Sequence, residues 1–346
     1  MNYYKQSSFS IEMSVLCVGD LHFKTSNAKQ SDEATAKLLE IASTLPNLRL
    51  VVVLGDVLDT HSKMNVGPYN RAYAFIKQLS TISPVIVLVG NHDYINNSQF
   101  LTTNHSLVAF REIPNVTVVD KPLARKVAGR KLVFCPYVQP GRLEEALDTL
   151  ASTVSGNKIE WRDSFCVFAH QEILGCRMGG IVSTEGDVWK KSHPLLVSGH
   201  IHDEQWVGDN VYFTGASMQH SFGESAGKSV ATLNLVVKEI SSVKLDVIRR
   251  KTYYLSPDEF KTWKPRRNIL AKLVVTGTPG EIALVRDSAR YGKLEKLGVV
   301  VTTRIQHQEE VEELTLEGIR SFDQLLLELI GEDAELKTAL ELLKSS

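Results

Sequence analysis

Five short polar strings, most of them placed directly after an apolar, β-branched run, constrain this 346-residue chain more than any other feature. Apolar runs of this length are typical of buried strands. Because open α/β sheets build their sites where the strands end, we expect the polar side chains to meet at one edge of a sheet. The strings, in chain order, are Asp20-Leu21-His22, Gly55-Asp56, Gly90-Asn91-His92-Asp93, Ala169-His170 and Gly199-His200-Ile201-His202.

Strand and helix patterns alternate at the start of the chain, which predicts crossover units and a partly parallel sheet. Strands are expected at residues 14–18, 50–54 and 85–89, and helices at 34–45 and 69–79. Later strand patterns lie at 116–119, 131–137, 164–169, 195–198, 211–214, 231–237 and 243–248, with a helix at 143–151. Their density favours two sheets packed face to face. We therefore predict an α/β fold, a four-layer sandwich of two packed mixed sheets flanked by helices.

A basic, proline-bearing stretch at residues 261–267 predicts a linker between a large domain and smaller units. We expect an N-terminal tail at 1–12, a large domain at 13–260, a small α+β unit at 266–312 and C-terminal helices at 316–346. The small unit has strand patterns at 269–275 and 298–305 around a helical pattern at 280–291. Between Phe322 and Ile330 the apolar residues recur at helical spacing, which predicts an amphipathic helix.

The overall charge and the cysteines exclude several classes of protein. Lys and Arg number 39 and Asp and Glu 40, so the formal net charge of −1 carries no general signature of a nucleic-acid or membrane partner. The four cysteines are widely spaced and form no Cys-x-x-Cys pair, which favours buried, reduced thiols and a cytoplasmic location. No apolar segment is long enough to span a membrane.

The polar strings combine carboxylate, amide and imidazole donors, which suits a site for divalent cations. The carboxylate of Asp56 has two oxygens and can bridge two cations, and Asn91 adds a neutral oxygen. This mixture of donors suits manganese or iron better than zinc, and no thiolate is present, which argues against a structural zinc site. His92 follows Asn91 and is placed to donate a proton to a leaving oxygen. We expect Asp93 to hold the His92 ring and its tautomer.

Taken together, these strings resemble the calcineurin-like metallophosphoesterase superfamily, and within it the recombination nucleases of the SbcD type, including their phage members. Gly55-Asp56-Val57-Leu58-Asp59-Thr60 is similar to a stretch found in SbcD, and residues 114–122 resemble the phage version. Some members carry a histidine where this chain has Asp59. The motif resemblance spans residues 14–220, and the rest of the chain agrees in organisation only.

The resemblance implies a role for each site residue. Asp20, His22, Asp56 and His202 would hold one metal ion, and Asp56, Asn91, His170 and His200 would hold the other. His92 would be the catalytic histidine. The two ions would be divalent cations, with Mn²⁺ expected and Mg²⁺ as the alternative. A hydroxide bridging them would attack the phosphodiester while His92 assists the leaving group.

The resemblance also implies an activity, a substrate and partners. The protein would be the nuclease subunit of an SbcCD-like nuclease–ATPase complex, a double-strand exonuclease and single-strand endonuclease in DNA recombination, repair and replication. Residues 266–312 would cap and position DNA, and residues 316–346 would bind an SbcC-like ATPase of the SMC family, within a homodimer. Two alternatives stay open. One is a small-molecule phosphodiesterase or phosphoprotein phosphatase, and the other is a non-catalytic scaffold on the same fold.

Several residues outside the strings are given simpler interpretations. We assign the remaining histidines, among them His61 and His220, to the surface or to positions behind the metal ligands. Basic residues at 249–251 and 264–267 are candidates for contact with phosphates, although basic linkers are commonly just solvated. Basic residues between 125 and 131 predict a hairpin.

Overall fold

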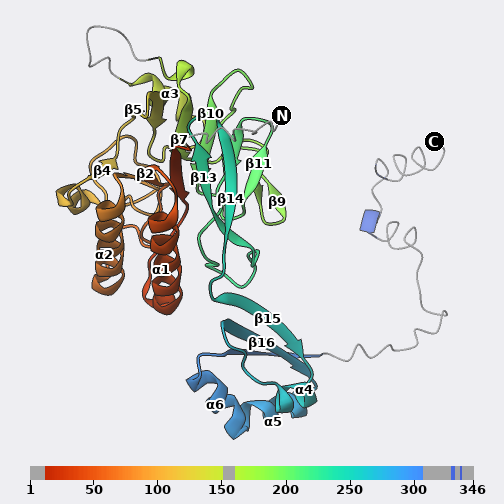
Figure 1. The fold of residues 1–346 in the computed structure, drawn as a ribbon. Coiled ribbons are helices and arrows are strands. Elements are labelled where there is room, and N and C mark those ends of the chain that lie inside the picture. The colour runs from red at the N-terminus through yellow and green to blue at the C-terminus, as the bar shows by residue number, and fades with distance from the viewer. Residues whose placement is uncertain (1–11, 151–159, 307–328, 332–335, 337–346) are drawn as a thin grey trace, which may run out of the picture.

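The computed structural model describes residues 12–150, 160–306, 329–331 and 336. The expected tail at 1–12, apart from Glu12, lies outside the described residues, and so do the expected helices at 316–346, apart from 329–331 and 336. Within the described residues a large lobe is followed by a small one, which lies beneath it in Figure 1.

Two six-stranded sheets pack face to face in the large lobe. The first has the order β14-β13-β1-β2-β3-β4, in which β1 to β4 are parallel and β13 runs antiparallel to β1. The second has the order β11-β12-β10-β7-β6-β5, with a parallel centre and antiparallel edges. The first sheet comprises β1 (Ser14–Val18), β2 (Leu48–Val53), β3 (Val85–Leu88), β4 (Val116–Val119), β13 (Lys228–Asn234) and β14 (Glu239–Leu245). The second comprises β5 (Leu123–Val127), β6 (Arg130–Phe134), β7 (Cys166–His170), β10 (Leu195–Gly199), β11 (Gln205–Val207) and β12 (Val211–Phe213).

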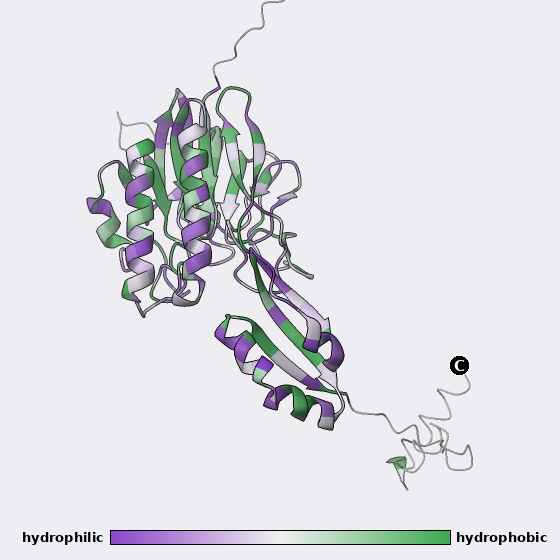
Figure 2. Ribbon diagram, turned by 60° about the horizontal axis from the view of Figure 1, so that its bottom comes forward, coloured by the Kyte–Doolittle hydropathy of each residue, from purple (hydrophilic) through white to green (hydrophobic). Residues whose placement is uncertain are grey.

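Both faces of the first sheet are buried, which explains why its strands are continuous apolar runs. Leu16 and Val53 face α1 (Ala28–Thr44) and α2 (Val66–Ile82), while Cys17 and Val52 face the second sheet. The outer face of the second sheet packs against α3 (Leu143–Asp148) and two buried tryptophans. The predicted α/β sandwich of two mixed sheets and flanking helices is therefore confirmed. Figure 2 shows the apolar strands inside and hydrophilic residues along the helices.

Short elements complete the large lobe. They are η1 (Thr25–Asn27), η2 (Val108–Glu112), η3 (Trp161–Asp163) and the hairpin of β8 (Arg177–Met178) and β9 (Ile181–Val182). All four cysteines are buried and unpaired, as predicted. Among the residues that the structure describes, no helix has the length and apolar character needed to cross a membrane.

The small lobe is a three-stranded parallel sheet, in the order β15-β16-β17, with a core of its own around Phe260 and Leu273. It contains β15 (Arg249–Leu255), α4 (Pro257–Thr262), β16 (Ile269–Gly277), α5 (Pro279–Asp287), α6 (Ala289–Lys296) and β17 (Val300–Ile305). The single helix expected at 280–291 is two helices, because the side chain of Ser288 caps α6 by accepting from the main-chain N–H of Tyr291.

The predicted domain boundary between residues 260 and 266 is wrong. β15 and α4 precede that boundary, yet β15 pairs along its whole length with β16 and Phe260 of α4 packs in the core of the small lobe. β15 was missed because it is a half-exposed edge strand with a basic, polar sequence, which lacks the apolar signal of a buried strand.

Candidate metal centre

The predicted donors converge on one edge of the two sheets. Asp20 and His22 follow β1, Asp56 follows β2 and Asn91 follows β3, while His170 ends β7 and His200 and His202 follow β10. The chain turns sharply to place them. Asp20, His22, Asp56 and His200 have φ values of 25°, 41°, 46° and 77°, in the left-handed region that non-glycine residues rarely adopt. Such strain is typical of functional sites, where the surrounding structure enforces it.

One group of donors surrounds His22. Its Nε2 lies 3.2 Å from Nε2 of His202 and 3.4 Å from Oδ2 of Asp56. Asp20 is completely buried beside them, and its Oδ1 accepts from the main-chain N–H of His200 at 3.0 Å. Its Oδ2 is also buried but has no hydrogen-bond partner among the described residues. A buried carboxylate oxygen without a partner is costly unless a cation binds it.

The second group surrounds Asn91. Its Oδ1 lies 3.0 Å from Nε2 of His170 and 3.1 Å from Nδ1 of His200. The other nitrogen of His170, Nδ1, donates to the carbonyl of Leu54 at 2.6 Å, because a carbonyl can only accept. In the neutral ring the lone pair of His170 then lies on Nε2 and is directed toward Asn91 and Asp56, the orientation that a metal ligand requires.

Asp56 connects the two groups. Its Oδ2 lies 3.4 Å from Nε2 of His22 and 3.3 Å from Nε2 of His170, while its Oδ1 accepts from the main-chain N–H of His92 at 2.9 Å. Burial alone would raise the pKa of Asp56, but the neighbouring histidines, His170 above all, hold it well below its ordinary value. An ionised carboxylate facing both groups is the arrangement expected of a bridging ligand.

The tautomers of His22 and His202 test whether this set fits a cation. Nδ1 of His22 lies 3.3 Å from a carboxylate oxygen of Asp59, and Nδ1 of His202 lies 3.3 Å from one of Glu224. Glu224 accepts a hydrogen bond from Nδ1 of His202, which leaves the lone pair of that ring on Nε2, 3.2 Å from Nε2 of His22. Nδ1 of His22 is buried and has no hydrogen-bond partner among the described residues. The Nε2 lone pair of His202 and the buried Oδ2 of Asp20, which has no hydrogen-bond partner among the described residues, both suit a bound cation, so the residues fit a divalent ion.

The electrostatic field in the site is consistent with that result. Burial lowers the pKa of His170, but the carboxylates of Asp56 and Asp20 outweigh burial and raise it to about 9. The pKa of His22 is also raised, since Asp56, Asp59 and Asp20 together outweigh its burial. The same negative field that favours protons on these imidazoles favours a divalent cation between them.

His92 lies at the margin of the site, with its ring edge-on to His22 at 4.8 Å. Its Nδ1 donates to the main-chain carbonyl of Asp59 at 3.1 Å, and the ring of His61 stacks on it at 5.0 Å. The ring is therefore fixed by a carbonyl and by an aromatic neighbour, and its Nε2 keeps the lone pair. Burial is the main cause that lowers the pKa of His92.

The predicted contact between Asp93 and the His92 ring is wrong. Asp93 is fully buried, and its carboxylate accepts instead from the main-chain N–H groups of Val57, Leu58 and Gly90. The Asp93 carboxylate therefore faces three main-chain N–H groups and not the His92 ring. The acceptor at His92 Nδ1 is the main-chain carbonyl of Asp59.

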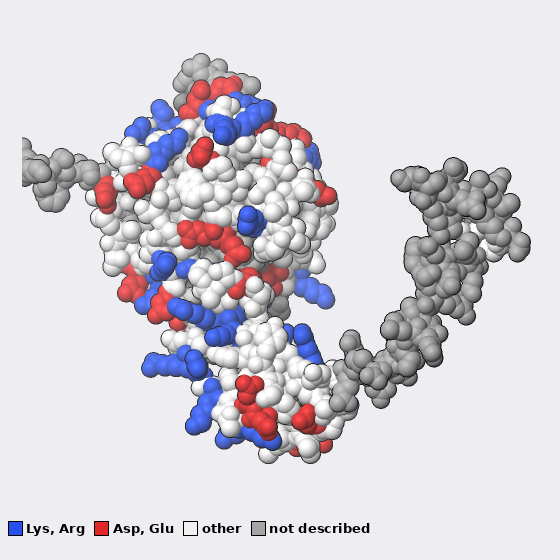
Figure 3. Space-filling view, turned by 90° about the vertical axis from the view of Figure 1, so that its right-hand side faces the viewer, with Lys and Arg blue, Asp and Glu red and all other residues white. Residues whose placement is uncertain are grey.

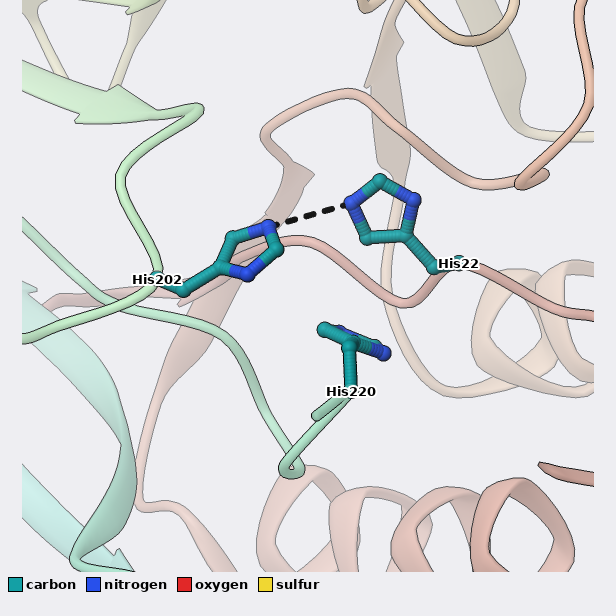
Figure 4. A group of neighbouring side chains, drawn as sticks. All are labelled: His22, His202 and His220. Atoms are coloured by element: carbon teal, nitrogen blue, oxygen red, sulfur yellow. Dashed lines mark hydrogen bonds between the residues drawn. The ribbon is translucent and has the colours of Figure 1, made fainter. Parts of the chain in front are cut away.

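Sequence reasoning missed two functional candidates in the loop after β12. Glu224 faces Nδ1 of His202, accepts from the main-chain N–H of His220 at 3.0 Å and pairs with the buried Lys228 at 3.1 Å. His220, which we had placed on the surface or behind the ligands, lies beside His22 and His202 (Figure 4). One feature of the sequence could have indicated these two residues: their loop follows a predicted strand, as the loops that carry the metal ligands do.

Comparison with known proteins agrees with this geometry. The sequence model of the calcineurin-like phosphoesterase family matches residues 13–277. The chain belongs to this family. It is 39% identical over 339 residues to a protein of Invertebrate iridescent virus 3 named "Putative phosphoesterase 078R", covering 94% of this chain and 95% of that protein. "Putative phosphoesterase 244L" of Invertebrate iridescent virus 6 is 37% identical over 276 residues, covering 76% of this chain and 94% of that protein.

A solved structure of an archaeal phosphodiesterase aligns with 67% of this chain and 100% of its own, at 13% identity and a TM-score of 0.37. The match to the family model confirms the superfamily resemblance noted from the motifs. The two viral relatives are phosphoesterases by name, and together with the family match and the clustered His and Asp donors this supports a metal-dependent phosphoesterase and leaves the substrate to be inferred.

Proposed function

We propose that this phosphoesterase is a DNA nuclease of the SbcD type that hydrolyses phosphodiester bonds. The observation that carries the two-metal chemistry is Asp56, whose single oxygen Oδ2 faces imidazoles of both donor groups, and the resemblance of residues 55–60 to SbcD supports DNA as the substrate. Two divalent cations, when bound, would polarise the phosphate and activate the attacking water. Asp20, His22, Asp56 and His202 would hold one ion, and Asp56, Asn91, His170 and His200 the other.

His92 is the chain's own candidate for proton transfer. Its ring is held by the carbonyl of Asp59 and by the stacked ring of His61, so it is oriented before substrate arrives. In its protonated form it would donate from Nε2 to the leaving oxygen, which stabilises the charge that develops there. Asp93 supports this chemistry indirectly, by bracing the loops that carry Asp56 and His92.

A polyanionic substrate is supported by cations near the site. A cavity of about 420 Å³ adjoins His200 and His202, and Arg177 of the β8–β9 hairpin lines it. Figure 3 shows Lys and Arg side chains gathered where the two lobes meet. A second cavity of about 430 Å³ there is lined by Lys29, Arg266 and Arg267, among others. Basic side chains in these two places would contact the phosphates of a nucleic-acid backbone.

The wider assembly is part of the same proposal. The small lobe would position DNA over the metal centre, and residues 316–346 would dock on the coiled coil of an SbcC-like SMC-family ATPase within a dimeric complex. Deleting residues 316–346 is expected to abolish co-purification with such an ATPase while metal binding stays at the wild-type level. Retained co-purification would refute the docking proposal.

A small-molecule phosphodiesterase is the second candidate, because the cavity beside His200 and His202 has a volume typical of sites for small ligands. A non-catalytic scaffold is disfavoured, since every predicted metal ligand is present and faces the site.

The experiment compares substrates on one preparation. Linear duplex DNA, circular single-stranded DNA, bis(p-nitrophenyl) phosphate and a phosphoserine peptide are incubated with protein and either Mn²⁺ or Mg²⁺. We expect cleavage of both DNAs, strongest with Mn²⁺. We also expect an Arg266→Ala/Arg267→Ala variant to lose more activity on duplex than on the small diester, with a shallower salt dependence. Turnover of the small diester alone would favour the second candidate, and no turnover at all would favour the scaffold.

A further inference from the structure

His220 occupies a position that the metal-site assignment above leaves unused. Its ring lies 4.7 Å from the ring of His22 and 5.0 Å from that of His202, edge-on to both. Figure 4 shows the three imidazoles turned toward a common space, with His220 beneath the pair formed by His22 and His202. One nitrogen from each ring lies within 4.8 Å of the other two, which is compatible with three bonds to one ion.

The hydrogen bonds of His220 define which nitrogen is free. Nε2 lies 3.0 Å from the main-chain carbonyl of Asp20, and a carbonyl can only accept, so Nε2 carries the proton. The neutral ring then has its lone pair on Nδ1. That atom is buried and has no hydrogen-bond partner among the described residues. A buried imidazole lone pair without a donor needs an explanation, and a cation beside it supplies one.

The loop that carries His220 is held rigidly on both sides. Glu224 accepts from the main-chain N–H of His220 at 3.0 Å, on the same carboxylate that faces Nδ1 of His202. On the other side Gln219 accepts from the main-chain N–H of Arg250 in β15 at 2.7 Å, and its own carbonyl accepts from the Arg250 side chain at 3.1 Å. The ring position is therefore set by the fold of both lobes.

We propose that His220 is an additional ligand, through Nδ1, of the cation held by His22 and His202. The proposal rests on the metal centre proposed above but is independent of the substrate. It makes one of the two sites rich in imidazole, with three histidines beside the carboxylates of Asp20 and Asp56. Imidazole donors favour transition metals over Mg²⁺. The extra ligand would therefore discriminate against Mg²⁺ at this site.

The test is metal binding by the full-length protein carrying His220→Gln, in which the amide can still donate to the carbonyl of Asp20. A His220→Ala variant removes that hydrogen bond as well. The control is His193→Gln, because His193 is also buried but packs against Trp161 and Trp189, away from the metal centre. Affinities for Mn²⁺ and Mg²⁺ are measured by equilibrium dialysis. Histidine nitrogens coupled to bound Mn²⁺ are counted by pulsed EPR on ¹⁵N-histidine-labelled protein.

We expect both His220 variants to bind Mn²⁺ at one site at least about 10–100-fold more weakly than wild type, the loss typical of removing even an outer partner of a ligand. One nitrogen coupling should disappear, and Mg²⁺ affinity should change less. Wild-type affinity and couplings in His220→Gln would overturn the proposal, even if His220→Ala were impaired, since His220 would then only hold the Asp20 backbone. Failure to cleave DNA would refute the nuclease proposal and leave this result unchanged.

Discussion

The carboxylate of Asp93 accepts a hydrogen bond from the main-chain N–H of Leu58 at 3.0 Å. Its other oxygen accepts from Gly90 at 3.0 Å and from Val57 at 3.2 Å, so one buried side chain joins the loop after β2 to the loop after β3. Burial and the nearby charge of Asp56 raise the pKa of Asp93 to about 7, against the three N–H groups that lower it. Asp93 thereby fixes the spacing of the loops that carry Asp56 and Asn91.

We predict that Asp93→Ala destabilises the protein by about 3 kcal/mol or more, because it leaves three buried N–H groups unpaired at roughly 1–3 kcal/mol each. Urea unfolding of the metal-free protein measures this. Asp246→Ala is the control, since the Asp246 side chain is 88% exposed, and it should shift stability by no more than about 0.5 kcal/mol. If Asp93 instead orients His92, the variant would keep its stability and lose activity alone.

Gly90→Ala should reduce metal binding sharply. A Cβ at this position would overlap the main-chain nitrogen and the carboxylate of Asp56, and backbone cannot move aside cheaply. Gly280→Ala is a matched control, because a Cβ at Gly280 meets no atom within 4 Å. Metal content after dialysis measures both variants. A Gly90→Ala protein with the wild-type metal content would show that Asp56 is not needed where the structure places it.

His92→Ala should keep its bound metal and lose about 10²–10⁴-fold in kcat on an unactivated diester such as DNA, the usual contribution of a general acid. The loss should be smaller on bis(p-nitrophenyl) phosphate, because p-nitrophenolate leaves without a proton. Steady-state kinetics on both substrates, with metal analysis of the same samples, separates the effects. Equal losses on the two substrates would exclude proton donation to the leaving group.

Asp120, which is not one of the predicted metal ligands, should make the free energy of unfolding depend on pH. Its carboxylate lies 3.4 Å from His105 and 2.5 Å from Arg111. Burial would raise the pKa of Asp120, but these two partners lower it below the ordinary value. Since the folded pKa is the lower one, the stabilisation is complete above the unfolded pKa of about 3.9 and is lost as the pH falls through the folded pKa.

Asp120→Asn should therefore cost about 1.5–3 kcal/mol at pH 7, the range for hydrogen bonds to a charged group, and progressively less in acid. Urea unfolding at pH 7 and at pH 3 checks this, with the exposed Glu112→Gln as control. A cost that stays constant over this range would mean that the charge of Asp120 contributes nothing.

Much of this protein could be read from its linear order of residues. Apolar runs such as Val51–Val53 predict strands buried on both faces, and donors such as Asp56 and His170 follow or end those strands. Because parallel strands end at one edge of a sheet, the order of strands and donors along the chain is enough to predict that the ligand side chains lie close together. The family resemblance added the expected division of these donors between two ions.

Tertiary structure decided what depends on side-chain direction and on contacts between distant segments. Asp93 is adjacent to His92 in sequence yet turns away from it, toward the backbone of Leu58. His220 lies beside His22 although the two are 198 residues apart in the sequence. β15 pairs with β16 of the small lobe, which its basic sequence did not predict. Local patterns specify which residues are buried and where strands end. The partner of each polar atom is set only when the whole chain has packed, because a hydrogen bond depends on direction as well as proximity.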